Sequence, residues 1–381
     1  MAKQSANQFD IVIAGGGMAG STLAWALLQA RPELQIAIIE QQKETISPVS
    51  FDSRSIALAR ASAQLLEQWG LWAELKHHAC AIETIHVSDR GHFGKTRLTA
   101  EEYLQDALGY VIEVEHIGVL LAQKLQQKNN VTWFSPNTIT QLNPSETAQN
   151  LLLHDGTELS CRLLLIAEGG MSPTRNLAGF NVTEQPYQQS AVIANLALAQ
   201  QHQHIAYERF TEHGPIALLP LSQDRYSLVF TTTAEHAAEL MQQTDSEFLA
   251  SVQQAFGYRA GIFATSGSRA SYPLVLRRCD SSVRHRTALL GNSLHNLHPI
   301  AGQGFNLALR DIAELVKQIN NSQTDIGGYA MLRGYQQARQ QDIALVSTAT
   351  DALVRLFSNR SRTIALARNT GLLAMSLCDA L

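Results

Sequence analysis

The residues whose types and spacing could support chemistry lie in the segment GNSLHNLHPIAGQGFNLALRD, Gly291–Asp311. His295 and His298 are three positions apart, which is a spacing that two metal ligands can have. Gly302 and Gly304 precede a helical pattern, so the segment could instead present backbone N–H groups at a helix N-terminus. No cluster of Asp, Glu or Cys completes a metal site. We therefore predict no metal, and structural histidines are favoured over histidines that line a pocket.

A second glycine-rich turn follows the apolar run FDIVIA near the N-terminus. Gly15, Gly17 and Gly20 form the pattern G-x-G-x-x-G between a predicted strand over 9–14 and a predicted helix over 21–30. A second strand, over 34–39, ends at Glu40. In such a β-α-β unit the glycines allow a tight turn, close approach of a pyrophosphate and close helix packing, and the acid accepts a ribose hydroxyl. The pattern predicts a dinucleotide site and, by itself, leaves NAD and FAD open.

The elements that follow favour FAD over NAD. After Glu40 the chain reads FDSRSIAL, Phe51–Leu58, and enters a predicted helix over 60–69, whereas an NAD enzyme would continue with further β-α units. A buried strand over 162–167 runs into EGGMSPTR, Glu168–Arg175, a turn that suits a phosphate. A short strand over 287–290 then leads into the segment 291–311, whose helix is predicted over 304–316.

Composition excludes several classes of protein. The chain has 381 residues, a formal net charge of −4, 45% hydrophobic and 16% charged residues, which is typical of a soluble globular protein and gives no basic stripe for nucleic acid. Ile11–Leu28 is uncharged and about as long as a membrane span, but its clustered glycines and the lack of a cleavage pattern indicate a strand, a turn and a helix. Four scattered cysteines without CxxC indicate idle thiols in a reducing compartment. We expect the chain in the cytoplasm.

The whole chain resembles the class A flavoprotein aromatic hydroxylases of the ubiquinone-biosynthesis branch. The resemblance rests on GGGMAG, FDSRSIAL, VSDRGH, YERFTEHGPIALLPL and GNSLHNLHPIAGQGFNLALRD. It implies an α/β fold in which a Rossmann-like FAD-binding domain is interleaved with a β-sheet substrate domain and followed by C-terminal helices. The FAD-binding domain would comprise 1–75, 100–180 and 280–320, the substrate-side sheet 76–99 and 181–279, and the helical segment 325–381.

The resemblance also implies roles for individual residues. The ADP half of FAD would be held by Gly15, Gly17, Met18, Ala19, Gly20 and Glu40, and Glu168 and Gly169 would also bind the cofactor. Arg54 would lie near the flavin and pyrophosphate, and Gly291 and Asn292 near the ribityl chain. The isoalloxazine would lie along Pro299, Gly302, Gln303, Gly304, Phe305 and Asn306. The helix N-terminus there would stabilise the negative charge of the reduced flavin, and Tyr207 and Arg209 would be polar contacts of the substrate.

The function that the resemblance implies is an FAD-dependent monooxygenase (hydroxylase) that acts on a prenylated methoxyphenol through a flavin C4a-hydroperoxide. NADPH or NADH would be the reductant and O₂ the co-substrate. Asn292 and Glu168 replace the aspartates that are usual in this family, which leaves another electron donor open. The alternatives are a related prenyl reductase and a non-catalytic flavin-holding subunit of a quinone-biosynthesis complex. The ring position, the prenyl length and the oligomeric state are not predicted.

The C-terminal part adds two alternatives for partners. Between Arg333 and Arg368 there are six arginines and two aspartates, interspersed with apolar residues at partly helical spacing. Such a helix could lie on an anionic membrane surface, which would place the protein at the inner face of the membrane. It could equally be a helical lid on the flavin domain with solvated arginines. Other ubiquinone-biosynthesis proteins are further expected partners.

Overall fold

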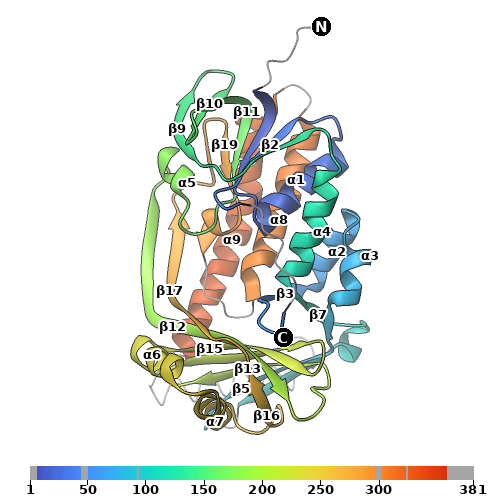
Figure 1. Ribbon diagram of the computed structural model, residues 1–381, viewed down its shortest axis with the longest axis vertical. Coiled ribbons are helices and arrows are strands. Elements are labelled where there is room, and N and C mark those ends of the chain that lie inside the picture. The colour runs from blue at the N-terminus through green and yellow to red at the C-terminus, as the bar shows by residue number, and fades with distance from the viewer. Residues whose placement is uncertain (1–6, 44–49, 92–93, 297–301, 323–324, 358–381) are drawn as a thin grey trace.

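A computed structural model describes residues 7–43, 50–91, 94–296, 302–322 and 325–357 of the chain. Figure 1 shows two large sheets at opposite ends of the long axis, with a group of helices between them. The helices α1 (Met18–Ala30), α4 (Val114–Gln126), α8 (Gln303–Asn321) and α9 (Tyr329–Phe357) pack beside the first sheet. The helices α6 (Ala234–Gln242) and α7 (Asp245–Phe256) lie on the outer side of the second sheet (Figure 1).

The first sheet has a parallel centre with the order β18-β19-β11-β1-β2-β8, and a β9–β10 hairpin pairs with β11. Side chains alternate along β1: Ile11 and Ile13 face the helices, whereas Val12 and Ala14 face the core under the hairpin. The strands are β1 (Gln8–Ala14), β2 (Ile36–Ile39), β8 (Val131–Phe134), β9 (Ile139–Pro144), β10 (Gln149–Leu153), β11 (Glu158–Ile166), β18 (Val283–Arg284) and β19 (Thr287–Leu289).

The second sheet is antiparallel except where β13 pairs in parallel with β5, and its order is β20-β17-β12-β15-β14-β13-β5-β6 with β16 beside β12. One face forms a core with α6 and α7. The strands are β5 (Thr84–Asp89), β6 (Lys95–Thr99), β12 (Val182–Leu198), β13 (Ile205–Thr211), β14 (Gly214–Leu221), β15 (Arg225–Thr233), β16 (Phe263–Ser266), β17 (Ala270–Cys279) and β20 (His295–Asn296).

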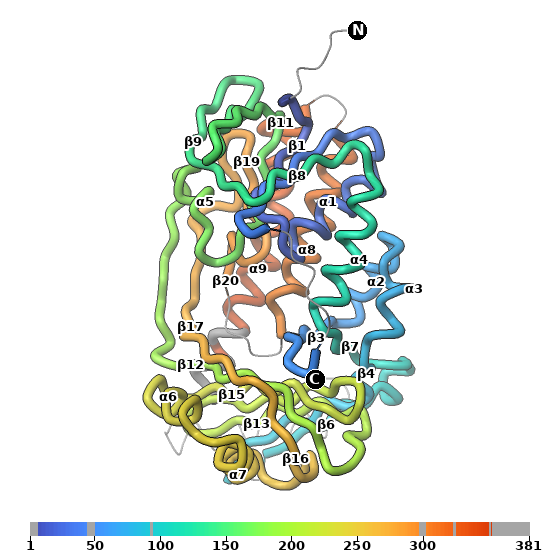
Figure 2. Tube along the Cα trace, viewed as in Figure 1, coloured from blue at the N-terminus to red at the C-terminus, as the bar shows by residue number. Residues whose placement is uncertain are grey.

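A small third sheet connects the two ends of the molecule. It contains β3 (Ser55–Ala59), β7 (Gly109–Glu113) and β4 (Cys80–Ile82), and the helices α2 (Arg60–Gln68) and α3 (Trp72–Leu75) follow β3 along the chain. Figures 1 and 2 show β3 and β7 between the helices and the second sheet. Ile82 and Val111 of this sheet pack against Ala206 of β13 and Leu221 of β14. The inner face of the second sheet is therefore the face that contains Ala206.

The predicted fold class is confirmed: the chain is a mixed α/β protein with a parallel nucleotide-binding type of sheet, a second antiparallel sheet and C-terminal helices. Ile11–Leu28 forms the end of β1, a turn and most of α1, as predicted. Among the helices that the structure describes, none has the length and apolar character needed to cross a membrane. The residue ranges of the two domains remain a proposal.

The C-terminal helix α9 is packed into the protein along much of its described length. It lies against α8 and reaches β14 of the second sheet. Arg339 is buried and forms ion pairs with Asp311 and Asp342. This arginine is therefore neither solvated nor available to a membrane surface, while Arg360, Arg362 and Arg368 lie outside the described residues.

Candidate flavin site

The N-terminal glycine turn has the geometry that a bound pyrophosphate requires. Gly15 has φ +100°, and a Cβ there would lie 2.6 Å from the Ala167 carbonyl oxygen; a Cβ on Gly20 would lie 1.9 Å from the Gly15 oxygen. Gly17, the N-cap of α1, is different because a Cβ there would meet no atom of a described residue within 4 Å. Two glycines are thus required by the protein's own backbone, and Gly17 borders open space at a helix N-terminus, where phosphates bind.

Glu40 lies directly against this turn. Its Oε2 accepts a hydrogen bond from the Gly16 N–H at 2.8 Å, and its Oε1 accepts one from the Gln42 N–H at 2.9 Å. A Cβ on Gly16 would lie 2.5 Å from the ring of Trp133, so this glycine, which the sequence pattern does not single out, is also required. The carboxylate keeps lone pairs for a ribose hydroxyl, because each oxygen can accept more than one bond.

The turn after β11 is held together by Glu168. This carboxylate accepts hydrogen bonds from the Ser172 hydroxyl at 2.6 Å and from the Thr174 N–H and hydroxyl at 3.1 and 2.6 Å, at the start of α5 (Pro173–Leu177). Arg175 is buried and donates to the carbonyls of Gly170 and Ser293, both at 3.0 Å. The sequence pattern suggested that this turn faces a phosphate. The Arg175 guanidinium instead connects the turn to the segment that begins at Gly291.

The N-terminus of α8 lies beside that segment. Gly302 is the N-cap residue with φ 59° and gives the helix no side-chain cap. Of the residues that the structure describes, a Cβ on Gly304 would have only Asn292 Oδ1 nearby, at 3.7 Å, and Asn292 is itself exposed. A Cβ on Gly291 would lie 3.3 Å from Ala308 of α8 and 3.9 Å from Ala19 of α1. The N-terminal halves of α1 and α8 are therefore brought together around Gly291.

Several predicted cofactor residues point into the protein instead. Asn306 is buried: its Oδ1 accepts from the Ala59 N–H at 2.8 Å, and its Nδ2 donates to the carbonyls of Ala57 and Gly302 at 2.8 and 2.9 Å. Phe305 belongs to the core beside the first sheet. The Asn306 side chain thus fixes the start of α8 against β3. Met18 and Ala19 are half-buried against the same core, and Pro299 and His298 lie outside the described residues.

A buried ionic network, which the sequence does not predict, supports the Gly291 segment from behind. Asp311 of α8 is fully buried; its Oδ2 accepts from the Gly291 N–H at 2.9 Å and lies 2.9 Å from His295 Nε2, and its Oδ1 accepts from Arg339 Nε at 2.7 Å. Burial alone would raise the pKa of Asp311, but His295, Arg339 and the Gly291 N–H outweigh it and lower the pKa. His295 is therefore a structural histidine, as predicted.

This network gives an expected result for stability. Asp311→Asn leaves His295 buried without its carboxylate and the buried Arg339 with Asp342 alone, so we expect a loss of about 3 kcal/mol or more in the free energy of unfolding at pH 7. Because the folded-state pKa of Asp311 is lowered, its contribution is complete above the unfolded value of about 3.9 and is lost as the pH falls through the folded value. Urea unfolding from pH 7 to pH 3 should show the difference between the two proteins shrinking below about pH 4.

The matched control is Asp245→Asn, since Asp245 pairs with Arg269 but has a side chain that is 69% exposed. This variant should lose less than about 1 kcal/mol. An Asp311→Asn protein as stable as the control at pH 7 would contradict the role given to the network.

The strand β13 places Tyr207 and Arg209 differently from the prediction. Tyr207 is buried in the core with α7; its hydroxyl donates to the Arg259 carbonyl at 3.2 Å and its ring contacts Phe256. The Arg209 guanidinium lies 5.9 Å from the centre of the same Phe256 ring. Both side chains therefore point to the outer face of the second sheet, and we no longer propose them as substrate contacts.

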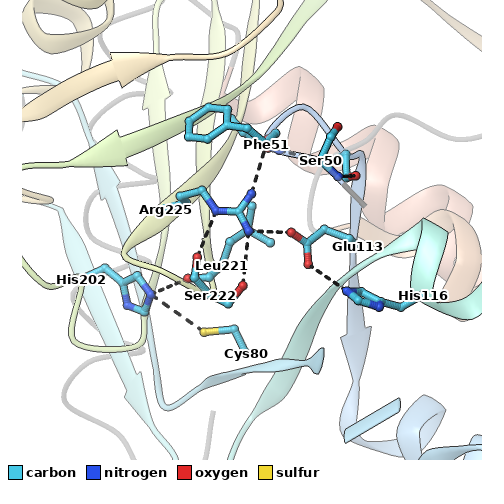
Figure 3. Close-up of polar contacts among 11 residues, drawn as sticks. Ser50, Phe51, Cys80, Glu113, His116, His202, Leu221, Ser222 and Arg225 are labelled. Atoms are coloured by element: carbon cyan, nitrogen blue, oxygen red, sulfur yellow. Dashed lines mark hydrogen bonds and ion pairs between the residues drawn. The ribbon is translucent and has the colours of Figure 1, made fainter. Parts of the chain in front are cut away.

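The inner face of the second sheet holds the segment FDSR against the protein. Asn195 of β12 donates from Nδ2 to the carbonyls of Phe51 and Ser53 at 2.7 and 2.8 Å. Arg225 of β15 forms a buried ion pair with Glu113 of β7 at 2.7 Å, and Figure 3 shows it between Glu113, Ser222 and Phe51. Arg54 is exposed, and no described residue forms a hydrogen bond or ion pair with its side chain. Its guanidinium thus remains a candidate for an anionic ligand.

Comparisons with known proteins agree with this geometry. The family model described as "FAD binding domain" matches residues 8–350. The chain is 33% identical over 372 residues to a ubiquinone hydroxylase, UbiL, of Rhodospirillum rubrum, covering 95% of this chain and 85% of the relative. It is 30% identical over 427 residues to the mitochondrial ubiquinone biosynthesis monooxygenase COQ6 of Mus musculus, covering 96% of this chain and 87% of the relative.

Solved structures share the fold. The crystal structure of pqsL, a probable FAD-dependent monooxygenase from Pseudomonas aeruginosa, has a TM-score of 0.80 at 24% identity and covers 96% of this chain and 100% of its own. A variant of HpxO from Klebsiella pneumoniae, complexed with FAD, has a TM-score of 0.76 at 15% identity, covering 97% of this chain and 99% of its own. The chain belongs to the FAD-binding domain family and, within it, to the FAD-dependent monooxygenases of ubiquinone biosynthesis.

Proposed function

We propose that the protein hydroxylates the aromatic ring of a prenylated methoxyphenol, a reaction of the kind carried out by 2-octaprenyl-6-methoxyphenol hydroxylase, which the sequence resembles. The observation that carries the proposal is the convergence of two glycine-lined helix N-termini, Gly17 of α1 and Gly302–Gly304 of α8, around Gly291. Neither N-cap glycine offers a side-chain cap, and the described residues leave space beside Gly17 and Gly304, so an extended dinucleotide can contact both.

The residues that would hold FAD fit its chemistry. Gly17 and the N-terminus of α1 would bind the pyrophosphate, Glu40 the adenosine ribose, and Asn292 the ribityl chain. The N-terminus of α8 would stabilise the negative charge of the reduced flavin by about 1–2 kcal/mol. When bound, the flavin supplies the oxygen-transfer chemistry, which in the resembled family proceeds through a C4a-hydroperoxide with NADPH or NADH as reductant and O₂ as co-substrate.

The inner face of the second sheet would receive the aromatic ring. Ile193, Ala217, Leu219 and Val229 of β12, β14 and β15 lie on this face and are half-buried. Such a surface can orient an apolar ring and exclude water, while the prenyl tail needs only apolar contact. Contact with a membrane surface and with other ubiquinone-biosynthesis proteins is part of the same proposal, because a prenylated substrate resides in the membrane.

The experiment uses purified FAD-loaded protein with a short-chain prenylated methoxyphenol, NADPH or NADH, and ¹⁸O₂. The proposal expects one ¹⁸O atom in the ring of the product, measured by mass spectrometry. A product with a reduced prenyl chain and no ¹⁸O would instead identify a prenyl reductase. FAD that is reduced by neither nucleotide would point to another electron donor. In that case the flavin of the same sample is reduced photochemically, in place of that donor.

A further inference from the structure

Glu208 of β13 lies on the inner face of the second sheet, between the two outward-facing residues Tyr207 and Arg209. The strand register pairs Glu208 with Ala217 of β14 and Val87 of β5. Paired residues of adjacent strands share a face, and Ala206, two positions earlier on β13, packs against Val111 and Ile82 of the small sheet. Glu208 therefore points toward the side of the molecule that contains the candidate flavin site.

The carboxylate of Glu208 has no partner in the described part of the chain. Its Oε1 is buried without a hydrogen bond, and neither oxygen accepts one from a described residue. Its register neighbours Ala217 and Val87 are apolar. An ionised carboxylate in such surroundings is destabilising, because burial removes water without providing another donor. A residue that lowers the stability of the folded protein in this way is a candidate functional residue.

Burial alone raises the pKa of Glu208 to about 7. The register puts one other carboxylate, Asp89 of β5, on the same face, whereas Arg209 and the β6 residues Lys95 and Arg97 belong to the outer face. On the small sheet that packs against the inner face, Glu113 is already paired with Arg225. At neutral pH Glu208 is therefore poised between its two protonation states, as a general base should be.

We propose that Glu208 is a catalytic residue that accepts the phenolic proton of the substrate. The O–H bond of the phenol breaks, the proton goes to a Glu208 oxygen, and the electron pair stays on the phenolate oxygen. The phenolate raises the electron density of the ring that is to be hydroxylated, and the proton leaves Glu208 for solvent after turnover. This inference rests on the proposed function, since it requires a phenol on the inner face.

The test compares Glu208→Gln with the unchanged protein in kcat/KM for the prenylated methoxyphenol between about pH 5.5 and 9, a range that brackets the expected pKa. We expect FAD to be retained, kcat/KM to fall about 100-fold or more, and the acid limb with an apparent pKa near 7 to disappear. The matched control is Glu212→Gln, in the exposed turn that follows the same strand, which should change neither the rate nor the pH profile. Isotope-edited infrared spectra of the holoenzyme should show, near pH 6, a protonated carboxyl band that Glu208→Gln removes.

A second variant separates catalysis from folding. Glu208→Leu removes a half-buried carboxylate that has no partner among the described residues, so it should raise the urea midpoint at about pH 8, where that carboxylate is ionised, while hydroxylation is lost. A residue with a merely structural role would lower that midpoint. Glu208→Gln with an unchanged rate and pH profile, in a preparation whose unchanged protein hydroxylates the phenol, would overturn the inference alone. No hydroxylation by the unchanged protein, with FAD bound and reduced, would overturn the proposed function and the inference with it.

Discussion

Gly304→Val is expected to yield a folded protein that no longer binds FAD. Among the described residues, the one neighbour that a Cβ at this position would have within 4 Å is Asn292 Oδ1, at 3.7 Å. The described part of the protein therefore leaves room for the added side chain. In the proposed complex that space belongs to the flavin, so the valine methyl groups would overlap the ring. The measurement is the flavin absorbance of the purified variant, followed by titration with FAD.

The control for this prediction is Gly118→Val in α4. Gly118 is also helical, it is exposed, and a Cβ there would meet no atom of a described residue within 4 Å. Both variants replace a helical glycine by valine, whose helix propensity is somewhat higher, so helix propensity does not separate them. Gly118→Val should stay yellow with normal affinity. Equal flavin content in the two variants would show that the flavin does not lie at the N-terminus of α8.

Arg225→Leu is expected to destabilise the protein by about 3–5 kcal/mol. The side chains of Arg225 and Glu113 are 6% and 2% exposed, and their ion pair at 2.7 Å joins the second sheet to the small sheet. Arg225 also donates to the carbonyl of Phe51 at 3.4 Å and to that of Ser222 at 3.1 Å. Removing the guanidinium leaves the Glu113 carboxylate buried with only His116, 3.8 Å away, as a charge partner among the described residues. Urea unfolding measures the loss.

A double-mutant cycle isolates the pair. Arg225→Leu leaves the charge of Glu113 without its partner, and Glu113→Gln removes that charge. The double variant should therefore be clearly more stable than the sum of the two single losses predicts. Arg31→Leu is the comparison at the surface, because Arg31 pairs with Glu33 at 2.8 Å but Glu33 is 62% exposed. It should cost about 1 kcal/mol or less. A similarly small loss in Arg225→Leu would contradict a structural link between the sheets.

The features that could be predicted from the sequence are those that depend on near neighbours along the chain. The turn at Gly15, Gly17 and Gly20 is one such feature, because the strand, the glycines and the helix follow one another directly along the chain. The start of α8 at Gln303 is another, since Gly302 directly precedes an amphipathic pattern. In both places the local sequence and the fold agree.

The features that could not be predicted depend on which face a strand buries and on distant partners. In YERFT, Tyr207–Thr211, polar and apolar residues occur at both parities, so alternation alone does not tell whether Tyr207 or Glu208 faces inward. Packing of Tyr207 against Phe256 decides it. The buried network joins three separate parts of the chain, which contribute Asp311, His295 and Arg339. From the sequence alone, Arg339 would be predicted to lie at the surface.

The central claim, a ring hydroxylase of ubiquinone biosynthesis, is tested most directly by the quinone intermediates of cells that lack this chain. Lipid extracts of such cells, with and without the restored protein, are profiled by mass spectrometry, and Gly304→Val serves as the restored but flavin-free control. We predict that a prenylated methoxyphenol accumulates without the chain, is cleared when the intact protein is restored, and persists with Gly304→Val. An unchanged quinone profile in cells without the chain would contradict the claim.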